Sequence, residues 1–96
     1  MRLAAKVDAN QAEIVRVLRD ARCTVQHLHM VGNGCPDVLV FSPYAGRMVL
    51  LEIKDGSQPP SRRKLTKAEA RFHATWPADV HIVSSPDDAL RAVGAL

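Results

Sequence analysis

The first apolar pattern along the chain has the period of an α-helix. From about Asp8 to Arg22, apolar side chains recur at helical spacing, which predicts one amphipathic helix. The apolar positions in this stretch are Val7, Ile14, Val17, Leu18 and Ala21. Asp8 or Asn10 is the residue type that caps the start of such a helix.

The next pattern has a period of two. Residues 24–31, TVQHLHMV, are rich in β-branched and apolar residues, and His27 and His29 alternate with Val25. This alternation predicts a strand with one apolar face and one polar face. Residues 32–34, GNG, follow it and favour a tight turn.

Two further strands are predicted at residues 37–41 and 47–54, joined by a hairpin connection at residues 42–46. Side chains alternate between the two faces of a strand. In the second of these strands one face carries Val49, Leu51 and Ile53, and the other carries Leu50, Glu52 and Lys54. The strand therefore combines an apolar face with a face that holds an acid and a base.

The second half of the chain predicts a loop at residues 55–64, a helix at 65–76, a strand at 80–85 and a short helix at 86–93. The loop contains two prolines and is expected to be mobile. Thr66 and Glu69 have the spacing of a capping box at the start of the helix predicted at residues 65–76.

The predicted order is helix, three strands, helix, strand, helix. The third strand, the helix and the fourth strand resemble a crossover unit, whose two strands are parallel neighbours. The hairpin makes the middle strands antiparallel. We therefore expect a single α/β domain over residues 1–96, with a mixed sheet of about four strands flanked by helices.

Composition is consistent with a small globular domain of 96 residues, of which 47% are hydrophobic and 24% charged. No apolar run approaches the roughly 20 residues that span a bilayer, and the start of the chain has no secretory signal pattern. With Cys23 and Cys35 as the two cysteines, we expect reduced thiols and a cytoplasmic location. Phage origin, with action inside the host cell, is left open.

The formal net charge is only +3, but basic residues gather after residue 61. The cluster consists of Arg62, Arg63, Lys64, Lys67 and Arg71. Such a cluster is compatible with binding phosphate groups. A solvated loop and helix surface is the plainer interpretation of charge alone.

The hairpin brings three charged side chains together. Pairing Asp37 with Lys54, and Phe41 with Leu50, places Asp37 beside Glu52 and Lys54 at one edge of the sheet. Two neighbouring carboxylates repel unless a cation lies between them, and Mg²⁺ prefers carboxylate oxygens. A metal held there suits phosphodiester hydrolysis, with Lys54 orienting water or stabilising the developing negative charge.

The segments GCPDVLV, LLEIKDG and LTKAEARFH resemble the PD-(D/E)XK nuclease superfamily, and within it the compact virus-type replication-repair nuclease (VRR-NUC) domain. The resemblance runs over almost the whole chain. It implies Mg²⁺ or Mn²⁺ bound by Asp37, Glu52 and the main-chain carbonyl of Ile53, with Lys54 as the catalytic lysine. It also implies an acidic residue on the first helix, for which Glu13 fits.

The same resemblance implies an endonuclease in replication, repair or recombination that acts as a homodimer on branched DNA such as a four-way (Holliday) junction. Members of the family often carry a glutamine where this chain has Glu69. This departure puts a catalytic-site role of Glu69 in doubt, and the capping box with Thr66 explains the residue adequately.

Three other interpretations compete with a structure-specific nuclease. A nucleic-acid-binding domain of the same fold without catalysis would not need two adjacent carboxylates facing a polyanion. A zinc site would use Cys23, His27, His29 and Cys35, but their spacing matches no common zinc-finger pattern. A restriction-type endonuclease needs a surface for base readout, for which so small a chain has little room.

Overall fold

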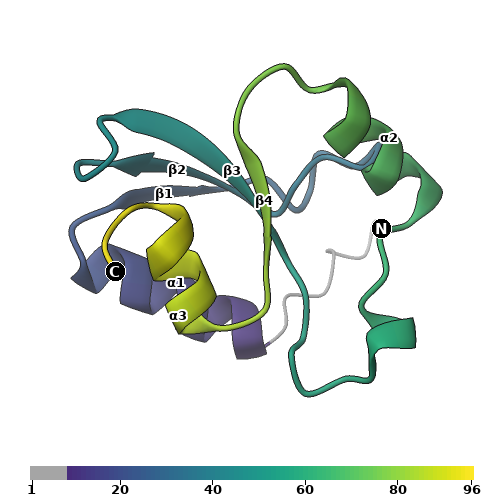
Figure 1. Cartoon of the computed structure of the whole chain (residues 1–96), viewed down its shortest axis with the longest axis horizontal. Coiled ribbons are helices and arrows are strands. Elements are labelled where there is room, and N and C mark those ends of the chain that lie inside the picture. The colour runs from purple at the N-terminus through teal and green to yellow at the C-terminus, as the bar shows by residue number, and fades with distance from the viewer. Residues whose placement is uncertain (1–8) are drawn as a thin grey trace, which may run out of the picture.

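A computed structural model describes residues 9–96 of the chain (Figure 1). The elements are α1 (Ala9–Asp20), β1 (Thr24–His27), β2 (Val38–Ser42), β3 (Arg47–Ile53), the 3₁₀ helix η1 (Pro60–Arg62), α2 (Lys67–Thr75), β4 (Val80–Val83) and α3 (Pro86–Ala92). The predicted order of the strands and α-helices is confirmed. Val7 and the proposed cap Asp8 lie outside the described residues, and Asn10 lies within α1 rather than at its cap.

The four strands form one mixed sheet in the order β1-β2-β3-β4. β1 pairs with β2 and β2 with β3 in antiparallel fashion, whereas β3 and β4 are parallel. The crossover from β3 to β4 runs through η1 and α2. The expected α/β class with a mixed sheet is therefore confirmed.

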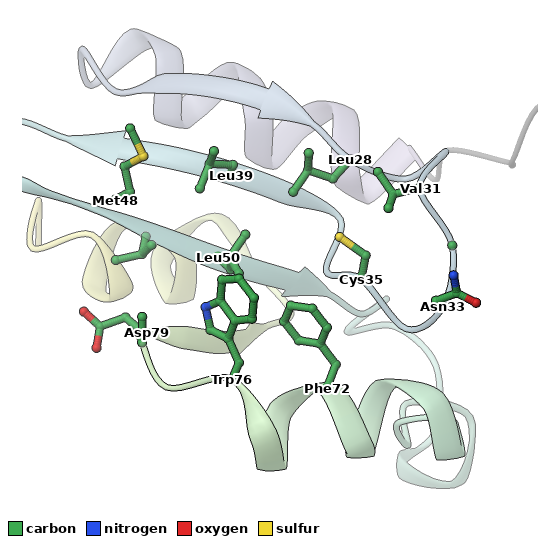
Figure 2. A pocket seen from close by; sticks show the side chains of 13 residues that line it. Leu28, Val31, Asn33, Cys35, Leu39, Met48, Leu50, Phe72, Trp76 and Asp79 are labelled. Carbon is green, nitrogen blue, oxygen red and sulfur yellow. The ribbon is translucent and has the colours of Figure 1, made fainter.

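The hydrophobic core lies between one face of the sheet and the helices α1 and α3, which lie side by side in Figure 1. Ile14 and Leu18 of α1, Val93 after α3 and Leu51 of β3 are fully buried there. Val49, Leu51 and Ile53 all belong to this core, as the alternation along β3 predicts. α2 stands apart from α1 and α3, on the side of the opposite sheet face (Figures 1 and 2).

Three predicted strands are longer than the strands observed, β3 by one residue and β1 and β4 by more. β1 ends at His27 instead of residue 31. The last cross-strand hydrogen bond runs from the Leu28 N–H to the Asp37 carbonyl. The chain then turns, because the Val31 N–H donates to the Leu28 carbonyl. β4 ends at Val83 instead of residue 85. Ser85 caps α3 instead, since its side chain accepts a hydrogen bond from the Asp88 N–H.

The predicted hairpin register is wrong by two residues. Val38 lies opposite Leu51, and Leu39 rather than Phe41 lies opposite Leu50. The turn causes the shift, because Ser42 and Arg47 pair directly across residues 43–46 and close the hairpin there. A shift of two keeps every side chain on its predicted face. It places Asp37 one step beyond the Val38–Leu51 pair, level with Glu52 instead of Lys54.

The loop before α2 contains a short 3₁₀ helix, η1, that the sequence pattern did not predict. Pro60 occupies the first turn of η1, where its fixed φ suits a helical start. α2 then begins at Lys67 with Thr66 as its N-cap, and the predicted capping box with Glu69 is present in both directions. The prolines and the capping box thus mark the starts of the two helical segments in the crossover.

Candidate active site

Asp37 lies at the start of β2 and is fastened to the end of β3 by two hydrogen bonds. Its N–H donates to the Leu51 carbonyl at 3.0 Å, and its Oδ2 accepts from the Ile53 N–H at 2.7 Å. The preceding Pro36 is buried, which anchors the chain at the point where β2 begins. The Asp37 carboxylate is therefore held across the end of β3, beside Glu52.

Glu52 is a buried acid near the end of β3, which is an inner strand of the sheet. The residue is only 3% exposed, and it lies between β2 and β4, where its register partner is Ile82. Its Oε1 is buried and has no hydrogen-bond partner. Buried polar atoms are almost always hydrogen-bonded, so this orphan oxygen marks a place where a partner is missing.

The environment of Glu52 strongly disfavours its charged form. Burial, then hydrogen bonding with the Asp37 side chain and the charges of Asp37 and Glu69, raise the pKa of Glu52 to about 9, against the opposing effect of Lys54. Glu52 therefore holds a proton at neutral pH. A divalent cation bound beside Glu52 would take the place of this proton.

Lys54 projects into the same site from the end of β3. Its Nζ donates to Oε1 of Glu69 at 2.9 Å and lies 3.9 Å from Oε2 of Glu52. Its side chain is 16% exposed, so the ammonium group lies mostly out of solvent. Lys54 therefore bridges the carboxyl pair of the sheet and the first turn of α2.

These side chains line one polar pocket of about 420 Å³. Its lining residues are Asp37, Glu52, Ile53, Lys54, Asp55, Gln58, Arg62 and Glu69. Asp55 is turned towards its own loop, where its Oδ1 accepts from the backbone and hydroxyl of Ser57. The pocket thus gathers Asp37, Glu52 and Lys54, as expected, and adds one arginine from the basic cluster.

The other predicted DNA-binding residues lie outside this pocket. Lys64, Lys67 and Arg71 are exposed, and Arg71 lines a small separate hollow with Phe72. Arg63 is half-buried, and its Nε has no hydrogen-bond partner. The cluster therefore extends from the edge of the polar pocket along η1 and α2 rather than surrounding the carboxylates.

The acidic residue that the family resemblance implies on the first helix does not line the polar pocket. Glu13 is exposed and is not among the residues that line the polar pocket. Asn10, three residues earlier, donates through Nδ2 to the Lys54 carbonyl at 2.7 Å. The only sequence signal at Asn10 was its suitability as a helix cap, which gives no indication of a contact with β3.

Glu69 lies in the site, contrary to the doubt raised by its departure from the family pattern. Burial opposes its ionisation, but the hydrogen bonds from Lys54 and from the Thr66 backbone outweigh that effect and lower the pKa of Glu69. The capping-box spacing predicted its contact with Thr66. Its contact with Lys54 depends on how α2 packs beside β3, which the spacing does not reveal.

The donor set fits a hard divalent cation that retains water ligands. Among residues 9–96, no group of three or more His, Cys, Asp or Glu side chains is arranged to hold a metal ion. Mg²⁺, however, is commonly bound by one or two carboxylates together with water. The orphan Oε1 of Glu52 beside Asp37 provides such a pair.

The four residues of the alternative zinc site do not form such a group. His27 and His29 have their ring centroids 5.6 Å apart in a T-shaped contact, and Gln11 Nε2 lies 3.3 Å from Nδ1 of His27. Cys23 and Cys35 are both free thiols. Burial, followed by the charges of Glu52 and Asp37, raises the pKa of the Cys35 thiol.

A larger and mostly apolar groove of about 610 Å³ lies on the sheet face that is opposite α1 and α3 (Figure 2). Phe72 and Trp76 point from α2 towards Leu39, Leu50 and Met48 of the sheet, as Figure 2 shows. The two aromatic rings are stacked with centroids 4.9 Å apart. With little polar surface in it, this groove is better suited to packing against another apolar surface than to phosphodiester chemistry.

Comparisons with protein-family models, with curated proteins and with solved structures gave no match. No helix among residues 9–96 combines the length and apolar character needed to cross a membrane.

Proposed function

We propose that this protein is a metal-dependent DNA endonuclease of the PD-(D/E)XK type, similar to a VRR-NUC domain and acting inside the cell. One observation carries the proposal. Asp37, Glu52 and Lys54, from the ends of two paired strands, line one pocket in which the buried Glu52 Oε1 has no partner. A buried acid without a full set of partners costs stability, so its presence indicates a functional demand.

Asp37, Glu52 and the main-chain carbonyl of Ile53 are the groups that would hold Mg²⁺ or Mn²⁺. A bound ion of this kind polarises the scissile phosphate and lowers the pKa of a bound water. The Ile53 N–H keeps Asp37 turned into the pocket. Lys54 supplies a cation beside the carboxyl pair, where it stabilises negative charge that develops at phosphorus or orients the attacking water.

Arg62 is the basic residue best placed to bind the phosphate next to the scissile bond, because it lines the pocket itself. Lys64, Lys67 and Arg71 continue the positive surface along η1 and α2. Phosphate contacts position a duplex without reading its sequence. A site of this composition therefore favours recognition of DNA structure, such as a branched junction, over recognition of a base sequence.

A cleavage assay tests the proposal. Labelled four-way junction, flap and linear duplex are incubated with Mg²⁺, Mn²⁺ or EDTA, with Lys54→Ala as the inactive variant and Glu13→Gln to test the implied acid of α1. We expect metal-dependent cuts at the branched substrates that disappear with Lys54→Ala while DNA binding persists. Binding without cleavage under every metal condition would instead favour a non-catalytic DNA-binding domain.

We further propose that the active form is a homodimer, formed through the apolar groove beside α2. Met48 and Trp76 line this groove and are 61% and 44% exposed. Exposed apolar surface gathered in one place is typical of a protein interface. A two-fold dimer would bury it and would present two polar pockets to the two strands of a branched substrate.

Sedimentation equilibrium checks the dimer. Met48→Lys should convert the dimer to monomer because it places a charge in the groove. Leu96→Lys is the matched control, since Leu96 is 66% exposed but is not among the residues that line the groove. A wild-type protein that sediments as a monomer at all concentrations would rule the dimer out.

A further inference from the structure

One oxygen of Glu69 serves two elements at once. Oε1 accepts a hydrogen bond from the Thr66 N–H at 2.8 Å, which closes the capping box of α2, and another from Lys54 Nζ at 2.9 Å. The Glu69 N–H completes the box by donating to Thr66 Oγ1 at 3.1 Å. The first turn of α2 is therefore joined through a single carboxylate to the lysine at the end of β3.

Lys54 has one alternative acid within reach, and the geometry favours Glu69 over it. The distance from Nζ to Oε2 of Glu52 is 3.9 Å, which is too long for a hydrogen bond. Glu69 is held at hydrogen-bond distance by a helix, and its side chain is 19% exposed. Lys54 Nζ therefore donates its hydrogen bond to Glu69 and not to Glu52. The Glu52 carboxyl group stays accessible from the pocket.

The position of α2 is itself determined by the glycine turn that precedes Asp37. Gly34 has a φ of +77°, and a Cβ built on it would lie 2.3 Å from the carbonyl oxygen of Ala68. No side chain fits in this contact, so the turn lies directly against the first turn of α2. The strand that carries Asp37 and the helix that carries Glu69 consequently meet at a fixed point.

We propose that Glu69 is a positioning residue for the active-site lysine, and that its hydrogen bond holds Lys54 Nζ beside the Asp37–Glu52 pair. This inference rests on the proposed nuclease function. A residue that served only as a helix cap would stabilise α2 without affecting the chemical step. The two roles can therefore be separated by kinetics.

Three variants make the separation. Glu69→Ala removes the acceptor for Lys54, Glu69→Gln keeps an acceptor oxygen, and Thr66→Ala weakens the cap without removing any partner of Lys54. Misplacement of a catalytic group by about 1 Å can cost about 100-fold in rate. We expect Glu69→Ala to lower kcat by about 10- to 100-fold with KM for DNA changed less than about threefold.

The matched variants should behave differently from Glu69→Ala. Thr66→Ala should lower the unfolding midpoint but leave kcat within about threefold at a temperature where the protein is folded. Glu69→Gln should restore most of the kcat lost in Glu69→Ala. Equal kcat losses in Glu69→Ala and Thr66→Ala, or wild-type kcat in Glu69→Ala, would overturn the inference.

A folding measurement distinguishes failure of this inference from failure of the proposed function. In a double-mutant cycle of Lys54→Ala and Glu69→Ala, the two changes should be coupled by about fivefold or more in the unfolding equilibrium constant. Coupling without any DNA cleavage by the wild type would reject the nuclease but keep the Lys54–Glu69 contact. Cleavage by the wild type without coupling in folding or in kcat would reject the positioning role alone.

Discussion

Replacing Glu52 by glutamine should stabilise the protein at neutral pH. The variant keeps the shape of the side chain but cannot ionise. Glu52 is 3% exposed, and burial together with the Asp37 carboxyl group raises its pKa from 4.5 to about 9. The folded wild type therefore keeps a proton on this residue between those pH values, whereas the unfolded chain releases it.

The sign of the pH dependence follows from this difference in proton binding. Because the folded state binds more protons than the unfolded state between pH 4.5 and about 9, the free energy of unfolding falls as pH rises through this range. Each pH unit costs about 1.36 kcal/mol, so the loss between pH 4.5 and pH 7.5 is at most about 4 kcal/mol. Glu52→Gln should lack this loss.

Urea unfolding at pH 4.5 and pH 7.5 measures the effect, followed by circular dichroism and by the fluorescence of the single tryptophan, Trp76. Glu13→Gln is the matched control, because it makes the same chemical change at an exposed position of α1. We expect the control to stay within about 0.5 kcal/mol of the wild type at both pH values. Mg²⁺ should stabilise the wild type at pH 7.5 and leave Glu52→Gln unchanged.

Two results would contradict this reasoning. One is an equal fall in the free energy of unfolding with pH in the wild type and Glu52→Gln, which would mean that Glu52 is ionised in the folded protein. The other is a Glu52→Gln variant that is less stable than the wild type at pH 7.5. In either case the raised pKa of Glu52 could not be used as support for a cation site.

Three further predictions concern other parts of the structure. Arg62→Ala should weaken DNA binding and reduce the slope of log Kd against log salt concentration by about one, as measured by fluorescence anisotropy. An unchanged slope would mean that Arg62 does not contact a phosphate. Gly34→Ala should destabilise the fold more than Gly32→Ala in urea unfolding, because both glycines have positive φ but of the two only Gly34 contacts the backbone of α2. Equal losses in the free energy of unfolding would refute that contact. Ser42→Ala should lower the free energy of unfolding by about 1–3 kcal/mol, because the buried Ser42 hydroxyl accepts from two backbone N–H groups and donates to the Val93 carbonyl. A loss below about 0.5 kcal/mol would contradict this.

Local patterns in the sequence predicted the elements and the faces of the strands. The alternation in β3 separated the core residues Val49, Leu51 and Ile53 from the side that carries Glu52 and Lys54, because strand periodicity is a property of consecutive residues. The capping box was predicted for the same reason, since its two residues lie three positions apart.

The sequence also indicated which residues of the candidate site come together. A hairpin turn obliges the start of β2 and the end of β3 to meet, whatever the exact register. Asp37, Glu52 and Lys54 therefore share a pocket even though the predicted pairing was wrong by two residues. The register itself depended on how the four-residue turn closes, with Ser42 opposite Arg47.

Only the tertiary structure decided the contacts between segments that are distant in sequence. Asn10 rather than Glu13 reaches the end of β3, and Glu69 is both a helix cap and a partner of Lys54. The raised pKa of Glu52 likewise arises from burial and from the carboxyl groups of Asp37 and Glu69, not from its neighbours in the chain. Such effects depend on the distances between packed elements, which the residue pattern within any one element does not contain.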